Sequence, residues 1–290
     1  MARVLLVPCL LAQTHDLRAP DALKLNLFER INRDRVHHGL QPVQFHAALS
    51  NLADRHCEEM LKQKYTSHWN RSGFKPYMRY SEGGIAAHTE ENIATMRRTP
   101  FRLSRESLER EVRERHESLL NEKPPADGHR RSILGPHHTD VGVGLAYDST
   151  GLVLIEVYAD EYARLQPTPA RARLSEKLKL SGAVFRPGYV LDSILIYFEP
   201  LPRKFSVAEL ESTGAYSLPD EFQTLRPILP SGYRYQDGGG GTIELRGAEF
   251  NCPLRFFRKQ PGVYIIGVFI KQKKPGAEPF LVTNACIFVE

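Results

Sequence analysis

The spacing of apolar residues changes near residue 165, and this change divides the chain into two parts of different fold class. Before it, apolar residues recur at helical spacing. After it, β-branched and aromatic runs alternate with turns rich in Gly and Pro. Two prolines in the junction 165–175 are typical of a linker. A chain of 290 residues is long enough for two domains. We therefore expect an α+β domain at 20–164, a linker, and a β-sandwich at 176–290.

Three amphipathic segments in the N-terminal part are long enough to form helices. The first is expected at 22–37 with Asp21 as its capping residue, and the second at 46–64. The third begins after Ser104 and ends near Asn121, because two prolines follow shortly afterwards. These helices would supply most of the N-terminal core.

Two apolar runs complete the N-terminal part as strands. They lie at 139–147 and 152–159 and flank Asp148-Ser-Thr-Gly151, which is a hairpin turn signal. A short helical turn is expected at 129–134, and the Gly-, Ser- and aromatic-rich stretch 65–89 is expected to be irregular. Helices combined with an antiparallel sheet indicate an α+β domain.

The C-terminal part contains short strand-like runs separated by turn clusters, such as the one at 237–241. Regular short strands of this kind are typical of an all-β, immunoglobulin-like sandwich. A short helical insertion is expected at 205–211. The predicted strands lie near 177–185, 190–198, 242–250, 263–271 and 280–289.

Basic and acidic residues are mixed along the chain. There are 39 Lys and Arg against 34 Asp and Glu, which gives a formal net charge of +5. Segment 102–117 alternates both signs, as a solvated helix face does, so no nucleic-acid partner is expected. No run approaches the ~20 apolar residues of a membrane-spanning helix, so no transmembrane segment is expected either.

The first residues have the order of a short secretory signal peptide. Arg3 precedes an apolar run from Val4 to Ala12, and Ala12 is a candidate cleavage site. The alternatives are a misassigned start codon or a first buried strand. We expect a signal peptide within 1–19 and a secreted or periplasmic protein.

The four cysteines do not have the spacing of a metal finger. Cys9 would leave with a signal peptide, and Cys57 lies in a helical pattern as a small apolar residue. Cys252 and Cys286 could form a disulfide in an exported protein, or remain two buried free thiols. The sequence leaves both alternatives open.

Three short motifs carry residues that could do chemistry. His68 lies in Ser-His-Trp-Asn, Glu91 in Glu-Glu-Asn-Ile-Ala, and His129 in Gly-His-Arg-Arg-Ser-Ile-Leu. Imidazoles with carboxylates bind divalent cations or transfer protons. Taken singly, a loop histidine is more often solvated or structural, and spacing alone does not bring these three together.

The motifs, in this order, resemble the bacterial branch of the CAP superfamily, which includes cysteine-rich secretory proteins, wasp venom antigens and plant pathogenesis-related proteins. The resemblance covers about residues 20–162. It implies a three-layer α-β-α sandwich with a central groove that holds two histidines and two glutamates, which bind a divalent metal in some members. Further matching motifs are Ile31-Asn32-x-x-Arg35, Gly39-Leu40-x-Pro42, Leu52-Ala53-x-x-His56 and Val141-Gly-Val-Gly144.

Carried over residue by residue, the resemblance makes His68 the first histidine, Glu91 the first glutamate and His129 the last histidine. It places the second glutamate late in the long helix, where Glu117 and Glu122 compete and the tryptophan of the family pattern is missing. At about 100° per residue, Glu122 falls on the inward side of the helix and Glu117 faces water. Glu122 is therefore the predicted fourth member.

The other histidines have simpler interpretations. His56 lies on an apolar helix face and is expected to be structural. His88 is a rival of His68 that lies nearer Glu91 in sequence, but the Ser-His-Trp context favours His68. His137 and His138 follow a proline in a loop and could contribute a surface metal contact, but they are expected to be solvated or to bind metal only adventitiously.

These residues support three functional hypotheses. The first is a binding module that holds Zn²⁺ or another divalent cation on His68 and His129, takes a lipid, glycan or peptide ligand, and uses the C-terminal domain to bind another protein or the cell surface. The second is a peptidase or esterase in which His68, Glu91, Glu122 and His129 are catalytic. Against it, the chain has no His-Glu-x-x-His helix and no Gly-x-Ser-x-Gly elbow. The third is a non-catalytic scaffold with a vestigial groove.

Overall fold

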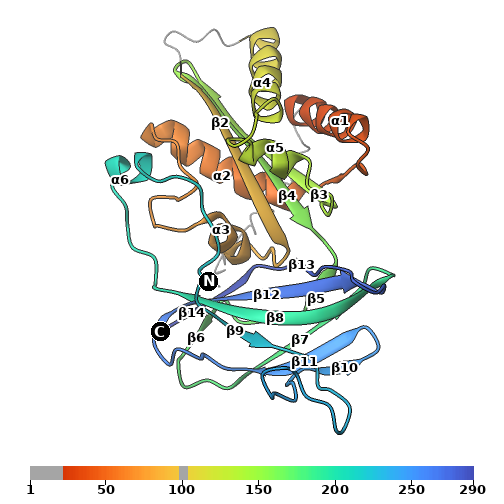
Figure 1. Cartoon of the computed structure of the whole chain (residues 1–290). Coiled ribbons are helices and arrows are strands. Elements are labelled where there is room, and N and C mark those ends of the chain that lie inside the picture. Colours follow the sequence, from red (N-terminus) through yellow and green to blue (C-terminus); the bar gives the residue numbers. More distant parts are fainter. Residues whose placement is uncertain (1–21, 98–103) are drawn as a thin grey trace, which may run out of the picture.

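The computed structural model describes residues 22–97 and 104–290. The predicted signal peptide, Cys9 and the predicted cap Asp21 lie outside the described residues. A helix-rich part and a strand-rich part lie one against the other (Figure 1). Among the helices that are described, none has the length and apolar character needed to cross a bilayer.

The N-terminal part is a three-layer arrangement around a four-stranded sheet of order β1-β3-β4-β2. One face packs against α1, α4 and α5 through residues such as Ile31 and Val112, and the other packs against α2 through Leu49 and Met60. Strand β4 is buried along its whole length because helices cover both faces. The elements are α1 (Ala22–His37), β1 (Gln44–Phe45), α2 (Ala47–Gln63), α3 (Pro76–Glu82), β2 (His88–Arg97), α4 (Arg105–Leu120), α5 (Gly128–Ile133), β3 (Asp140–Asp148) and β4 (Gly151–Asp160).

Two glycines let α2 lie directly on the sheet. A Cβ at Gly142 would come within 2.6 Å of the Leu49 Cβ, and a Cβ at Gly144 within 2.6 Å of the Ala53 Cβ. Real Cβ atoms do not approach so closely. The Val-Gly-Val-Gly segment of β3 is therefore a contact surface for α2.

Two elements lie in and beside the stretch that was expected to be irregular. Helix α3 packs on a distant strand, where the Ser81 Oγ accepts a hydrogen bond from the Cys286 N–H at 2.7 Å. Strand β2 reads His-Thr-Glu-Glu-Asn-Ile-Ala-Thr-Met-Arg, with several polar side chains on the buried edge of the sheet. Neither element shows strong local periodicity, because partners elsewhere in the chain stabilise both.

The C-terminal part consists of two sheets that enclose one apolar core. One sheet has the order β10-β11-β7-β5; the other has the order β6-β14-β12-β8-β9, with β13 on β12. The segment expected as a linker takes part in these sheets, since β5 ends at Leu165 and β6 pairs with β14. The elements are β5 (Ala163–Leu165), β6 (Arg171–Ala172), β7 (Leu178–Val184), β8 (Tyr189–Glu199), α6 (Val207–Glu211), β9 (Phe222–Leu225), β10 (Glu244–Arg246), β11 (Glu249–Leu254), β12 (Gly262–Gln272), β13 (Phe280–Leu281) and β14 (Ala285–Val289).

The two parts share an apolar interface. Tyr77 and Met78 of α3 pack on Ile265 and Phe288 of the larger sheet. The segment 201–218 leaves the sandwich between β8 and β9 and lies on the N-terminal part, where Leu210 of α6 joins the core beneath α2 (Figure 1). The helical insertion thus connects the two parts.

The described cysteines Cys57, Cys252 and Cys286 are buried free thiols. Cys252 faces the core between the two C-terminal sheets, whereas Cys286 faces the interface with α3. Of the two alternatives for Cys252 and Cys286, the structure has the free thiols, because the two side chains point into different cores.

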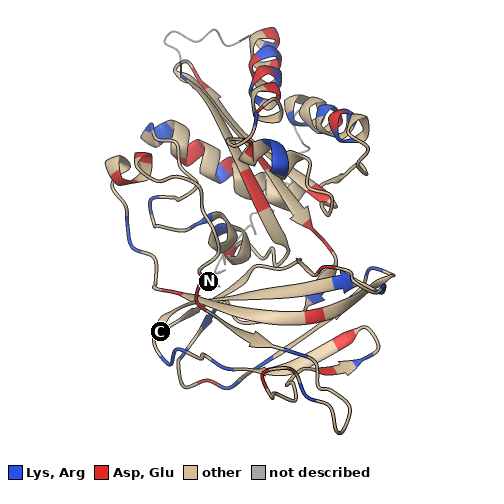
Figure 2. Ribbon diagram, viewed as in Figure 1, with Lys and Arg blue, Asp and Glu red and all other residues tan. Residues whose placement is uncertain are grey.

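Charges of both signs alternate along α4 (Figure 2). Pairs such as Arg105–Glu109, at 2.8 Å, follow the i,i+4 spacing of a solvated helix face. Within the described residues 104–117, this is the pattern expected of segment 102–117.

Candidate functional site

A groove of about 580 Å³ follows β2, the edge strand of the N-terminal sheet. The four predicted residues His68, Glu91, Glu122 and His129 all line it, together with the β2 residues 88–92. The C-terminal part supplies residues 215–218 and Asn284. The structure therefore brings the four predicted residues into one groove and adds a wall that the sequence analysis did not foresee.

The first pair is buried. His68 Nδ1 lies 3.0 Å from Glu91 Oε1, and Glu91 is 4% exposed. Arg79 Nη2 donates to both carboxylate oxygens at 2.9 and 2.8 Å, and the Tyr80 hydroxyl donates to Oε2 at 2.5 Å. Burial opposes ionisation, but Arg79 and His68 outweigh it and hold the pKa of Glu91 well below its usual range.

Glu91 is therefore a saturated carboxylate whose role is to orient His68. Its contact occupies Nδ1 of the imidazole and leaves Nε2 available to a ligand. The Tyr216 ring lies 4.9 Å from the His68 ring, and its hydroxyl accepts the Glu91 backbone N–H at 3.0 Å. A residue of the C-terminal part thus closes one side of the first pair.

The second pair is more open. His129 Nδ1 lies 2.5 Å from Glu122 Oε1, and the His129 backbone N–H donates to Oε2 at 3.0 Å. The side chains of His129 and Glu122 are 37% and 23% exposed. Asn92 Nδ2 donates to the His129 carbonyl at 3.0 Å and ties the pair to β2. Both pairs thus flank the same edge strand.

The position of Glu122 has a different cause from the one expected. Helix α4 ends at Leu120, so helical phase does not extend to Glu122. The first turn of α5 holds the carboxylate instead, through the His129 N–H. Glu117 lies outside the groove and contacts Arg30 Nη2 at 3.2 Å.

The other histidines take fixed positions. Buried His56 contacts the Ser67 carbonyl at 2.9 Å, and burial lowers its pKa to about 3, as suits a structural side chain. The expectation that the 137–138 pair is solvated was wrong for His138, which is buried between the Asp160 carboxylate and the Ser132 carbonyl at 2.8 and 2.9 Å. His137 stacks on Phe280 at 3.7 Å between ring centroids.

Three residues of the site were not predicted: Arg79, which holds Glu91 from behind the groove, and Tyr216 and Asn284, which line it. Arg79 lies in the unpredicted helix α3. Tyr216 and Asn284 are separated from Glu91 by more than a hundred residues of chain. No local pattern marks them, because only the packing of the two parts brings them to the groove.

The groove gives a divalent ion an incomplete set of protein ligands. Within residues 22–97 and 104–290, no three His, Cys, Asp or Glu side chains are grouped to hold a metal ion. His68 and His129 each present one ring nitrogen, whereas zinc sites usually have three or four protein ligands. The metal assignment of these two histidines therefore stays a prediction.

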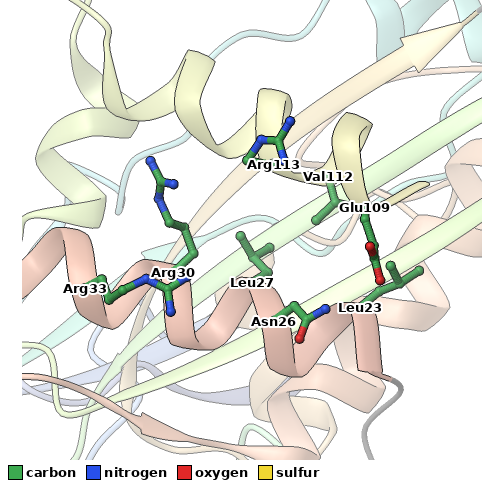
Figure 3. A pocket seen from close by; sticks show the side chains of 8 residues that line it. All are labelled: Leu23, Asn26, Leu27, Arg30, Arg33, Glu109, Val112 and Arg113. Carbon is green, nitrogen blue, oxygen red and sulfur yellow. The ribbon is translucent and has the colours of Figure 1, made fainter. Parts of the chain in front are cut away.

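A second hollow, of about 190 Å³, lies between α1 and α4. Leu27 and Val112 face each other across it, and Arg30, Arg33 and Arg113 surround it (Figure 3). None of the predicted site residues lines this hollow.

Comparison with known proteins gives a family match within the N-terminal part. Residues 28–159 match the Cysteine-rich secretory protein family, CAP. An uncharacterized protein, YkwD of Bacillus subtilis (strain 168), is 28% identical over 124 residues, which are 42% of this chain and 42% of that protein. The chain thus spans less than half the length of this curated relative.

Two solved structures are similar to parts of the chain. An extracellular protein containing a SCP domain from Bacillus anthracis is 21% identical with a TM-score of 0.39, covering 48% of this chain and 40% of that one. An outer surface protein of Borrelia burgdorferi is 14% identical with a TM-score of 0.40, covering 49% of this chain and 95% of that one.

Proposed function

Because residues 28–159 match the CAP family and are called the CAP domain below, we propose that the chain is a ligand-binding module and not a hydrolase. Its binding site is the groove along β2, and an extended ligand lies between the CAP domain and the C-terminal wall. The candidate ligand classes are a lipid, a glycan and a peptide.

The main support for this proposal is the environment of the Glu91 carboxylate. A general base needs a pKa near the working pH and an oxygen that can reach the proton to be removed. Glu91 is buried, has an ion pair and a tyrosine hydrogen bond, and has a strongly lowered pKa. These features suit a residue that fixes His68 for binding rather than one that activates water.

A divalent cation is part of the proposal. His68 and His129 each have Nδ1 on a carboxylate, which is the usual arrangement of an imidazole that binds metal through Nε2. Water or ligand atoms would complete the coordination. Zinc titration by calorimetry tests this: wild-type protein takes up the ion, and His68→Ala combined with His129→Ala does not. Equal uptake by both proteins would refute the metal site.

One observation favours hydrolysis as the second candidate. The His129–Glu122 pair is partly exposed and in close contact, as a general base and its orienting carboxylate would be. In that case, the ligand recovered after incubation would be cleaved, and Glu122→Gln would stop the cleavage.

Export belongs to the proposal as well. The apolar run near the N-terminus, with Arg3 before it and Ala12 as a candidate cleavage site, supports a secreted or periplasmic location. The immunoglobulin-like character of the C-terminal part, and its binding to another protein or the cell surface, are also proposals.

A groove-filling substitution tests the binding function. Ala215 is exposed and lines the groove, so Ala215→Trp narrows it without altering either His–Glu pair. Ala48→Trp, at an exposed position on α2, is the matched control. Both variants and the wild-type protein are presented with neutral oligosaccharides, a peptide library and single-chain fatty acids. Binding is followed by ligand-observed NMR, and each recovered ligand by mass spectrometry.

The proposal expects wild-type protein and Ala48→Trp to bind one class intact, and Ala215→Trp to lose that binding. Cleavage of the ligand would support the hydrolase instead. No binding in any class would refute the groove as a binding site and leave the scaffold hypothesis.

A further inference from the structure

The groove continues beyond the two His–Glu pairs to the point where the CAP domain meets the C-terminal sheet. A backbone bridge joins the two parts there: His88 N–H donates to the Val282 carbonyl at 2.9 Å, and Asn284 N–H donates to the Ala86 carbonyl at 3.0 Å. The His88 Nδ1 lies 2.6 Å from Asn284 Oδ1. Asn284 thus occupies a fixed place in the groove wall.

Two buried hydroxyl groups at this end have no hydrogen-bond partner of ordinary geometry in the described part of the chain. They belong to Thr89, which is 3% exposed, and Ser132, which is 6% exposed, and both residues line the groove. Buried polar atoms in folded proteins are nearly always paired. Hydroxyls that line a groove without a protein partner can pair with the hydroxyls of a ligand.

Glu90 presents a carboxylate beside the Ser132 hydroxyl. Its side chain is 43% exposed, and two histidine nitrogens, His88 Nε2 and His138 Nε2, lie 3.7 and 3.8 Å from its carboxylate, beyond hydrogen-bond length. Burial raises the pKa of Glu90, but His88 and His138, helped by the nearby serine hydroxyl, outweigh it and lower the pKa to about 2. The carboxylate is therefore ionised and can accept hydrogen bonds from a ligand.

The charge of the groove argues against an anionic ligand. Among the described residues that line it, none is Lys or Arg. Phosphate and sulfate groups are normally bound by such cations. A plain hydrocarbon chain also fits poorly, because it would cover Thr89, Glu90 and Ser132 without pairing them.

The opposite wall is aromatic. The rings of Tyr77 and Tyr216 lie 6.3 Å apart between centroids. Both hydroxyls are engaged, that of Tyr77 by Glu199 at 2.6 Å and that of Tyr216 by the Glu91 N–H. Tyr77 is 2% exposed, so the half-buried ring of Tyr216 is what this wall offers to a ligand.

From this arrangement we infer that Thr89, Glu90, Ser132 and Asn284 form a subsite for a sugar ring of a neutral glycan. Adjacent sugar hydroxyls donate to the Glu90 carboxylate and exchange hydrogen bonds with the two unpaired hydroxyls, since a hydroxyl both donates and accepts. The apolar face of the sugar ring lies toward the Tyr216 ring. The inference rests on the proposed binding function and names its ligand class. The four residues are called the glycan subsite below.

Ser132→Ala is the sharpest test, because it removes a hydroxyl that makes no hydrogen bond of ordinary geometry within the described chain. It should leave the melting temperature nearly unchanged, yet weaken oligosaccharide binding about tenfold. Glu90→Gln should weaken binding at least as much. Ser118→Ala, at an exposed position on α4, is the matched control and should bind like the wild-type protein.

The probes are neutral oligosaccharides of hexoses and of N-acetylhexosamines, three to six units long, measured by calorimetry on the full chain. Binding by the wild-type protein with the expected loss in Ser132→Ala supports the glycan subsite. Absence of oligosaccharide binding, or equal binding by wild type, Ser132→Ala and Glu90→Gln, overturns it. If peptides or fatty acids bind instead and Ala215→Trp abolishes that binding, the glycan subsite fails while the proposed binding function stands.

Discussion

Replacing Glu91 by Gln removes a negative charge from a fully buried position and keeps the shape of the side chain. Arg79 depends on that charge: its Nε and Nη1 atoms have no hydrogen-bond partner among the described residues. Its Nη2 atom bonds to Glu91 and, at 3.2 Å, to the His68 carbonyl. After the substitution the buried guanidinium would face neutral oxygens alone.

The cost can be bounded from the structure. The Glu91 side chain is 0% exposed, so solvent does not screen the pair. Removing one partner of a buried ion pair costs about 3–5 kcal/mol. A typical domain has a free energy of unfolding of about 5–15 kcal/mol, so Glu91→Gln should remove a large share of it.

Urea denaturation measures this loss, with the fluorescence of Trp69, the single tryptophan, as one signal and circular dichroism as the other. A double-mutant cycle with Arg79→Met isolates the pair. The double variant should be destabilised by at least about 1 kcal/mol less than the sum of the single variants. Glu117→Gln, which affects a partly exposed carboxylate on α4, should cost less than about 1 kcal/mol.

A loss below about 1 kcal/mol in Glu91→Gln, or strict additivity in the cycle, would refute the reasoning that this pair holds the groove together. A large loss has a practical consequence. Inactivity of Glu91→Gln would then report on folding, so the variant cannot identify Glu91 as a catalytic base. Glu122→Gln, at the open pair, is the better probe of catalysis.

Three further predictions concern stability. Burial lowers the pKa of His116, but two neighbouring carboxylates outweigh it and raise the pKa above 6.5, so its stabilisation is full below pH 6.5 and is lost as pH rises through the raised pKa. Urea denaturation across this pH range should show the free energy of unfolding falling with pH in the wild-type protein and falling less in His116→Gln. The same dependence on pH in both proteins would contradict the prediction. Gly144→Ala should cost about 1–3 kcal/mol by forcing α2 away from β3, as seen in the melting temperature, and no change would disprove the close packing. Because Cys252 and Cys286 are separate thiols, a reducing agent should leave the melting temperature unchanged, and thiol labelling of the unfolded chain should find both unpaired.

The sequence predicted best the elements whose stability comes from their own pattern. Helices α1, α2 and α4 lie within a residue or two of the expected ranges, because their apolar stripes face a nearby sheet. The β3–β4 hairpin follows for the same reason, since its turn signal and both apolar runs are local. Strand β2 does not follow: its buried Glu91 and Asn92 are satisfied by Arg79 and His129, which no local pattern connects to them.

The residues of the site were likewise predictable only where a local motif marks them. The order of the motifs indicated His68, Glu91 and His129, and the structure brings them together with Glu122 in one groove. The reason for preferring Glu122 was helical phase, but the helix ends two residues earlier and a backbone N–H holds the side chain. The wall of Tyr216 and Asn284 was invisible, because it depends on the docking of a separate sheet.

The segment 201–218, which leaves the sandwich between β8 and β9, has a consequence for how ligand selectivity can change during evolution. It begins and ends on neighbouring strands, β8 and β9, so changes in its length leave the sheet register intact. Its C-terminal end, residues 215–218, forms part of the groove wall. Insertions or substitutions at residues 215–218 can change which ligands the groove binds, while the cores of the CAP domain and of the sandwich keep their packing. Selectivity in this protein can thus evolve at residues 215–218, while Leu210 of the same segment keeps it anchored in the N-terminal core.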